Sequence, residues 1–140
     1  MITKTGTAHW EGDLKSGSGT ISSQSGALKD VAYGFATRFE GKAGSNPEEL
    51  IGAAHAACFS MALANMLAGA GITGVKINST SAISLDRDDA GFSITKAHLT
   101  TQISADADPA DILEIAQEAK ANCPVSRVLN AEVTMDATVV

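Results

Sequence analysis

The chain has 140 residues, which is enough for one domain with a buried core. Its 16 acidic and 10 basic residues give a formal charge of −6, and the basic residues do not cluster, so nucleic acid is not an expected partner. The N-terminus lacks the basic and then apolar pattern of a secretory signal, which predicts a cytoplasmic location.

The first 41 residues predict short strands. Residues 3–25 alternate polar and apolar side chains between Gly and Ser clusters, a pattern typical of antiparallel strands with tight turns. The segment AYGFATRFEG, residues 32–41, predicts a further strand with its aromatic side chains on one face. Period-two spacing places Arg38 on the opposite face.

A long helix is predicted over residues 47–69. Asn46 can cap its start, the proline that follows suits the first helical position, and Glu49 lies where the acid of a capping box belongs. The apolar run from 50 to 72 is dominated by Ala and Gly and is interrupted by His and Asn. We therefore expect a buried core helix and no membrane partner.

The second half of the chain predicts a hairpin, two helices and a strand. VKINSTSAISL and FSITKAHLTTQISAD alternate with period two on either side of the turn DRDDAG. Residues 108–122 predict a helix capped by Asp108, CPVSRVLN predicts a short helix, and AEVTMDATVV predicts a final strand. Because strands and helices occur in separate runs, the predicted fold class is α+β with an antiparallel sheet.

Two cysteines, Cys58 in the long helix and Cys123 just before Pro124, lie 65 residues apart. In a reducing compartment a static disulfide is rare, and a transient catalytic or sensing disulfide is commoner. Composition alone favours two inert buried thiols, since free cysteine is among the most buried residue types. Exposed amides at the start of the short helix can stabilise a Cys123 thiolate, although an ordinary cysteine beside a helix cap has the same pattern.

A buried Cys58 needs a nearby cation to react, because burial raises the pKa of a thiol and keeps it protonated. His55, one helical turn away, and Arg38 are the candidates. Arginine fits better because it stays charged and offers several donors in one plane. Simpler interpretations exist: a satisfied histidine at a packed interface, a solvated strand arginine, and Glu48 as an acid that favours the helix dipole.

Five segments together resemble the osmotically inducible protein C (OsmC) family, the sister of the organic hydroperoxide resistance proteins. They are AHWEGD, YGFATRFEG, NPEELIGAAHAACFSMAL, DAGFSITKAHL and CPVSRVL, and they extend in this order over about residues 6–136. The resemblance implies one domain over residues 1–140, with antiparallel sheets packed on two central helices in an intertwined homodimer. It implies two active sites at the dimer interface and no metal or cofactor.

The resemblance also implies a thiol-dependent peroxidase that reduces organic hydroperoxides, and hydrogen peroxide more weakly, in oxidative and osmotic stress defence. Cys58 in AACF matches the peroxidatic cysteine, and Cys123 before PVS matches the resolving cysteine. Arg38 in TRFEG matches the arginine that stabilises the thiolate, and Glu48 in NPEE matches the glutamate that orients this arginine. An external dithiol is implied as the reductant of the resulting disulfide.

Two other functions remain open. A cysteine acyl-transfer hydrolase with His55 as its base requires His55 close to the sulfur and an oxyanion hole. A redox-sensing or small-ligand-binding dimer predicts disulfide formation without rapid turnover.

Helix geometry adds one hypothesis about the dimer. Glu48 and Cys58 are ten residues apart on one predicted helix, which is about 15 Å along the helix axis. Neither side chain can span that gap. We therefore expect Glu48 to serve the cysteine of a partner chain, across two long helices packed antiparallel.

Overall fold

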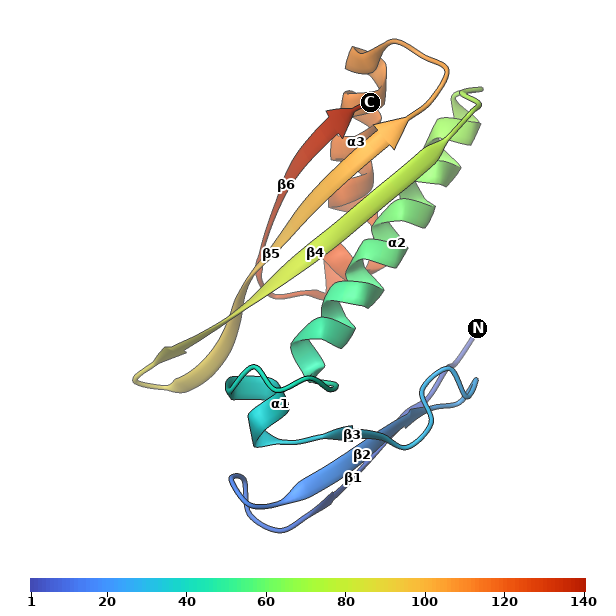
Figure 1. Cartoon of the computed structure of the whole chain (residues 1–140). Coiled ribbons are helices and arrows are strands. Elements are labelled where there is room, and N and C mark those ends of the chain that lie inside the picture. Colours follow the sequence, from blue (N-terminus) through green and yellow to red (C-terminus); the bar gives the residue numbers. More distant parts are fainter. The chain divides into compact units, whose positions relative to one another are not determined.

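The computed structural model describes all 140 residues of the chain. The residues form two compact units, residues 1–50 and residues 51–140. Each unit is described by itself, with the element labels of Figure 1.

The first unit is a small antiparallel sheet followed by a short helix (Figure 1). Its elements are β1 (Gly6–Glu11), β2 (Ser18–Ser23), β3 (Val31–Tyr33) and α1 (Phe35–Phe39), with strand order β1-β2-β3. The antiparallel β1–β2 pair confirms the strands predicted within residues 3–25. Only Gly19 is fully buried in this unit, so the sheet has no apolar core of its own.

The strand predicted over residues 32–41 is wrong, because β3 ends at Tyr33 and α1 follows. The hydroxyl of Thr37 accepts a hydrogen bond from the amide of Gly34 and donates one to its carbonyl, both at 3.0 Å. These local bonds close a helical turn. The spacing of four between Phe35 and Phe39 fits a helix as well as a strand, and their rings pack at a tilt with centroids 4.9 Å apart.

The second unit is a three-stranded sheet with helices packed against it. Its elements are α2 (Pro47–Gly69, which begins in the first unit), β4 (Lys76–Asp88), β5 (Gly91–Ser104), α3 (Pro109–Asn122), α4 (Pro124–Val128) and β6 (Glu132–Val139). This order confirms the predicted long helix, hairpin, second and third helices and final strand. The caps are also as predicted: Asn46 accepts from the amide of Glu49 at 2.8 Å, and Asp108 accepts from the amide of Ala110 at 2.9 Å.

The expectation of purely antiparallel sheets is wrong for one strand. β4 and β5 pair antiparallel, whereas β6 pairs parallel with β5. The chain returns through α3 and α4 between these two strands, and such a helical crossover is what a parallel pairing requires. The fold class α+β, with two separate sheets, is as predicted.

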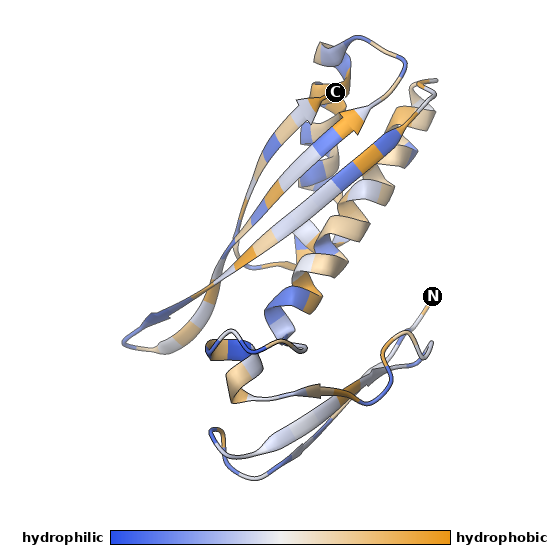
Figure 2. Cartoon of the chain, viewed as in Figure 1, coloured by the Kyte–Doolittle hydropathy of each residue, from blue (hydrophilic) through white to orange (hydrophobic).

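The core of the second unit lies between its sheet and the helices α2 and α3, which lie on one side of the sheet in Figure 1. Figure 2 shows the alternating hydropathy of β4 and the largely apolar colour of α2. The buried core side chains are Phe59, Leu63, Leu67, Leu99, Ile103, Ile112, Ala116, Ala119 and Cys123.

Helix α2 approaches β4 closely at Gly52. A Cβ atom at this position would lie 2.6 Å from the backbone oxygen of Ser81, so only glycine permits the approach. By length and composition, α2 is the one helix long and apolar enough to cross a membrane. Its fully buried Phe59, Leu63 and Leu67 pack within the unit's own core, in agreement with the predicted core helix.

The other face of α2 is exposed and lined by small side chains. Its small residues are Ala53, Ala54 and Ala57, and Met61, a larger residue that is 75% exposed, follows them. Side chains this small allow a second helix to approach closely.

Candidate active site

The fold brings Cys58 and Cys123 together although they are 65 residues apart in the chain. Cys58 extends from the middle of α2, and Cys123 is the residue between α3 and α4. Both are free thiols, and each shifts the pKa of the other. Cys123 is fully buried and Cys58 is partly buried, so a small molecule reaches Cys58 more readily.

Burial raises the pKa of the Cys58 thiol, as the sequence predicts. The side-chain hydrogen bond with Cys123 raises it further, and the amide of Val125 lowers it only in part. No cation is among the groups that act on Cys58. Burial and Cys123 therefore work against a thiolate at Cys58.

The environment of Cys123 works in the opposite direction. Burial raises its pKa, but the hydrogen bonds from Cys58 and from the amide and hydroxyl of Ser126, with a smaller contribution from the Val125 amide, outweigh burial and lower it overall. This agrees with the prediction that amides at the start of the short helix stabilise a Cys123 thiolate.

The backbone of Cys123 is held on both sides. Its amide donates to the carbonyl of Ala119 at 2.9 Å, and its carbonyl accepts from the amide of Arg127 at 3.1 Å. Cys123 thereby ends α3 and begins α4. The sulfur can move by side-chain rotation while the main chain stays in place.

His55 is fully buried one turn before Cys58 and bridges two hydroxyls. Its Nδ1 lies 2.7 Å from Ser81 Oγ on β4, and its Nε2 lies 2.8 Å from Ser126 Oγ on α4. Burial lowers the pKa of His55, so the ring is neutral and is not the cation that Cys58 needs. Both nitrogens are engaged with serines, so neither is left to act as a base toward Cys58.

Ser81 and Ser126 are not identified as site residues by the sequence analysis. A sequence feature could have pointed to Ser126, because it belongs to the segment CPVS beside Cys123. No feature distinguishes Ser81 from the other alternating polar residues of its strand.

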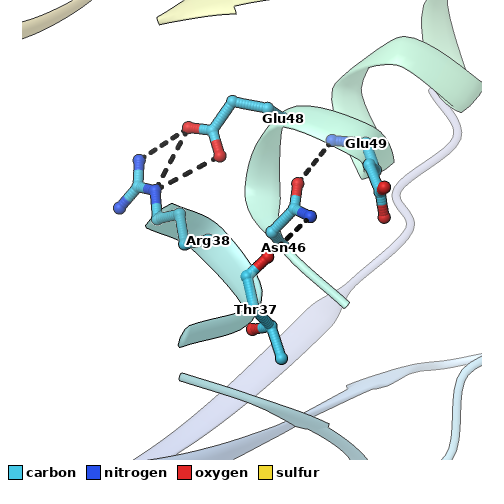
Figure 3. Close-up of polar contacts among 5 residues, drawn as sticks. All are labelled: Thr37, Arg38, Asn46, Glu48 and Glu49. Carbon is cyan, nitrogen blue, oxygen red and sulfur yellow. Dashed lines mark hydrogen bonds and ion pairs between the residues drawn. The ribbon is translucent and has the colours of Figure 1, made fainter. Parts of the chain in front are cut away.

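Arg38 and Glu48 form an ion pair within the first unit (Figure 3). Arg38 Nη2 lies 2.7 Å from Glu48 Oε1, and Arg38 Nε lies 3.2 Å from each carboxylate oxygen. The carboxylate thus holds the guanidinium by two of its nitrogens, which fixes the plane of the group. The Glu48 side chain is 13% exposed and that of Arg38 is 35% exposed, so one face of the cation stays accessible.

Asn46 ties the helix that carries Arg38 to the helix that carries Glu48. Its side-chain amide donates to the carbonyl of Thr37 in α1 at 3.2 Å, while its oxygen caps α2 (Figure 3). The ion pair is therefore supported by backbone contacts at both ends.

An apolar cavity of about 210 Å³ lies beside Arg38 in the first unit. Trp10 and Tyr33 pack against each other in its wall, with ring centroids 5.4 Å apart. The other residues that line it are Leu14, Gly34, Phe35, Phe39 and Pro47. The cavity offers an alkyl or aryl group an apolar surface next to a cation.

Comparison with known proteins assigns the family. The model of the family described as OsmC-like protein matches residues 39–138. Peroxiredoxin OsmC of Escherichia coli (strain K12) is 57% identical over 136 residues, which cover 96% of this chain and 95% of the relative. The chain belongs to the OsmC family.

Solved structures agree with membership in the OsmC family. The organic hydroperoxide resistance protein OhrB of Bacillus subtilis is 26% identical with a TM-score of 0.70, over 96% of this chain and 98% of that protein. An organic hydroperoxide resistance protein from Elizabethkingia anophelis has a TM-score of 0.78 at 23% identity, over 100% of this chain and 98% of that one. The similarity to the Elizabethkingia anophelis protein shows that the two chains share a fold.

Proposed function

We propose that this protein is a cysteine-based peroxidase that reduces organic hydroperoxides to alcohols. The observation that carries the proposal is the contact between two free thiols, Cys58 and Cys123. The 57% identity to a peroxiredoxin supports it. A fold that brings two distant thiols into contact without a disulfide is suited to a disulfide that forms and is reduced repeatedly.

The reaction begins at the more accessible thiol. The Cys58 thiolate attacks the distal peroxide oxygen, the O–O bond breaks, and the alcohol leaves after protonation, so that Cys58 becomes a sulfenic acid. Cys123 then attacks the Cys58 sulfur. The S–O bond breaks, the hydroxide takes up the proton that Cys123 has lost, and the products are a disulfide and water. An external dithiol reduces the disulfide by exchange.

Arg38 is the cation that this scheme assigns to Cys58. It stabilises the thiolate and the charge that develops on the peroxide oxygens. Glu48 fixes the guanidinium plane through the three short contacts of the ion pair. Such a cation would offset the burial that raises the pKa of Cys58.

The apolar cavity beside Arg38 supports a preference for organic peroxides. Its aromatic wall suits the alkyl or aryl part of the substrate, while the guanidinium receives the peroxide group. Hydrogen peroxide has no apolar part to bury, so we expect it to react more weakly.

We assign the active form to a homodimer whose long helices pack antiparallel. An antiparallel pair that sets Glu48 of one chain opposite Cys58 of the other is centred on residue 53, midway between them. Residue 53 belongs to the exposed stripe of Ala53, Ala54 and Ala57, where small side chains permit a close helix pair.

The sheet of the first unit also favours the dimer. A three-stranded sheet needs a packed apolar face to be stable, and this unit buries no large apolar side chain of its own. We propose that the whole chain, residues 1–140, acts as one domain of such a dimer. We assign it to oxidative and osmotic stress defence in the cytoplasm.

A redox sensor is the second candidate, and the raised pKa of Cys58 is the observation that favours it. A thiol that stays protonated reacts slowly, which suits disulfide formation without rapid turnover. Stopped-flow measurement of cumene hydroperoxide consumption, with catalytic amounts of protein and several dithiols, separates the two. Multiple rapid turnovers support the peroxidase, and a single slow oxidation supports the sensor.

The variant Cys123→Ser tests the two thiol roles directly. We expect it to react once with peroxide and then to stall or oxidise further to sulfinic acid, because no thiol is left to condense with the intermediate. Intact mass should show added oxygen in the variant and a loss of two hydrogens in the wild-type protein. Sustained dithiol-driven turnover by Cys123→Ser would exclude Cys123 as the resolving cysteine.

A further inference from the structure

Ser126 lies between Cys123 and the buried ring of His55 in the second unit. Ser126 is the third residue of α4, three residues after Cys123, and its amide and hydroxyl both act on the Cys123 sulfur. Its hydroxyl also lies 2.8 Å from Nε2 of His55 on α2. The far nitrogen of the same ring lies 2.7 Å from Ser81 Oγ on β4. Hydrogen bonds therefore link Ser81, His55 and Ser126, and Ser126 in turn acts on the Cys123 sulfur.

His55 and Cys123 are buried, where an unsatisfied polar group is costly, while Ser81 and Ser126 are partly buried. His55 is fully buried, and each of its ring nitrogens has one hydroxyl partner. The reaction scheme above assigns no role to the ring.

We propose that His55 is a positioning residue that acts through Ser126 to hold Cys123 in the geometry from which it attacks the oxidised Cys58. The inference rests on the proposed peroxidase function. It assigns His55 and Ser126 to the second step, disulfide formation, and leaves the first step, attack on peroxide, to Cys58 and Arg38.

The hydrogen-bond chain can run in two directions, and the two directions match the two protonation states of Cys123. In one, Ser81 donates to Nδ1, Nε2–H donates to Ser126, and the Ser126 hydroxyl donates to a Cys123 thiolate. In the other, the Cys123 thiol donates to Ser126, Ser126 donates to Nε2, and Nδ1–H donates to Ser81. The ring stays neutral in both. When Cys123 ionises along this chain, each group passes one proton on and the partly buried Ser81 releases one to solvent, so no charge is left on the buried histidine.

The titratable groups that face Cys123 are few. Cys58 acts on it directly from α2, and His55 faces it through Ser126. The remaining groups that act on the sulfur are the uncharged amides and hydroxyl of α4, with no carboxylate or amine among them. Removing the Ser126 hydroxyl therefore deletes a donor to the thiolate without disturbing a charged neighbour.

The test separates the two steps in time. One equivalent of cumene hydroperoxide is mixed with reduced protein over a range of pH, samples are quenched with acid, and intact mass follows the sulfenic acid and the disulfide. We expect Ser126→Ala to form the sulfenic acid at the wild-type rate. Its disulfide formation should be about tenfold slower, with the pH midpoint of that step raised by about one unit, because a hydrogen bond to a charged group is lost.

Matched variants distinguish this role from a loss of packing. Ser126→Thr keeps the hydroxyl and should restore the pH profile. Ser81→Ala removes the far end of the chain and should have a smaller effect in the same direction. Ser79→Ala is the control: this β4 hydroxyl bonds to Thr101 and Ser60, away from the sulfurs, and its loss should change neither step. His55→Gln should retain more of the resolving rate than His55→Leu.

A second measurement needs no peroxide. In Cys58→Ser protein the thiolate absorbance of Cys123 is titrated with and without Ser126→Ala, and we expect the second substitution to raise the pKa of Cys123 by about one unit. Wild-type protein that consumes no peroxide would contradict the proposed function. Wild-type protein that forms its disulfide normally, with unchanged rate, pH profile and titration in Ser126→Ala, would overturn this inference alone.

Discussion

At the scale of single residues, the contacts within the second unit stabilise the thiolate of Cys123 and not that of Cys58, although Cys58 is the residue that must attack the peroxide. Cys58, which we assign to attack, has a raised pKa, and Cys123, which we assign to resolution, has a lowered one. A lowered pKa suits the second step, in which Cys123 must act as a thiolate. The first step then depends on Arg38, whose guanidinium Glu48 already holds in one plane.

Replacement of Arg38 tests that dependence. We expect Arg38→Ala to raise the pKa of Cys58 by about one to three units, the range for the loss of a close opposite charge. Arg38→Lys should recover only part of the shift, because a point charge does not reproduce the planar fork. Thiolate absorbance titrated against pH, in a Cys123→Ser background that isolates Cys58, measures the effect. An unchanged titration in Arg38→Ala would remove Arg38 from the site.

The buried His55 predicts a dependence of stability on pH. In the unfolded chain this ring binds a proton at a pKa near 6.5, whereas burial lowers its pKa in the folded chain. Between these two values the unfolded state binds more protons, so the free energy of unfolding falls as the pH drops below about 6.5.

We expect His55 to contribute up to about 1.4 kcal/mol of this loss per pH unit, and His55→Gln to remove the contribution. Urea unfolding at several pH values between 7 and 5 measures it. His9→Gln changes an exposed histidine and serves as the control. Equal pH dependence in His55→Gln and wild-type protein would show that the ring does not titrate differently on unfolding.

The sequence nominates the cysteines, Arg38 and Glu48 as site residues but does not reveal the residues around them. Their motifs are local, so short segments identify them. The hydrogen bonds of His55 join residues 26 and 71 positions away, and no local pattern encodes contacts of that length. The sequence could therefore suggest a satisfied histidine at an interface but could not name Ser81 or Ser126 as its partners.

At the scale of elements, α1 and β6 show where periodicity misleads. Aromatic residues at alternate positions predicted a strand over residues 32–41, but the spacing of Phe35 and Phe39 fits a helical turn equally well. The hydrogen bonds between Gly34 and Thr37 stabilise the helical turn rather than the strand. For β6 the pattern predicted a strand correctly, and only its direction was wrong, because pairing direction depends on the crossover and not on alternation.

The close contact between α2 and β4 predicts the effect of a single methyl group. Gly52→Ala would place a Cβ atom 2.6 Å from the Ser81 carbonyl oxygen, so the helix must move away from the strand. We expect a loss of about 1–3 kcal/mol in the free energy of unfolding, the usual cost of overpacking, despite the better helix propensity of alanine.

Gly69→Ala is the matched control for this prediction. Gly69 ends the same helix, and a Cβ atom there meets nothing within 4 Å, so little change or a slight stabilisation is expected. Chemical unfolding of both variants gives the comparison. Equal stability of the two variants would mean that α2 adjusts to the methyl group without cost.

At the scale of the whole molecule, the proposed dimer makes two chains responsible for each site. Glu48 and Cys58 are carried by one helix, about 15 Å apart along its axis, so they cannot act on each other within a chain. The exposed alanine stripe midway between them is where the partner helix would cross.

Complementation tests this arrangement. Glu48→Ala and Cys58→Ser homodimers should each be severely impaired. Co-refolded in equal amounts, random pairing gives heterodimers as half of all dimers, each with one site that unites an intact Cys58 with the partner's intact Glu48. Peroxidase activity should then return to about a quarter of the wild-type value, by this count of sites.

The control mixes Glu48→Ala with a chain that carries both substitutions, which cannot complete any site. It should recover no activity. Confirmed Glu48→Ala and Cys58→Ser heterodimers without activity would show that Glu48 does not serve the partner's cysteine.

The fixed backbone of Cys123, bonded to Ala119 on one side and Arg127 on the other, has a consequence for the living cell. A sulfur held in this way presents itself to the oxidised Cys58 at a constant effective concentration, whatever the amount of protein present. Further oxidation of Cys58 instead depends on how much peroxide surrounds the protein. In the reaction that we propose, the ratio of the two rates defines a peroxide concentration above which more molecules are overoxidised than resolved. That concentration depends on how the joint between α3 and α4 holds Cys123 and not on the amount of protein.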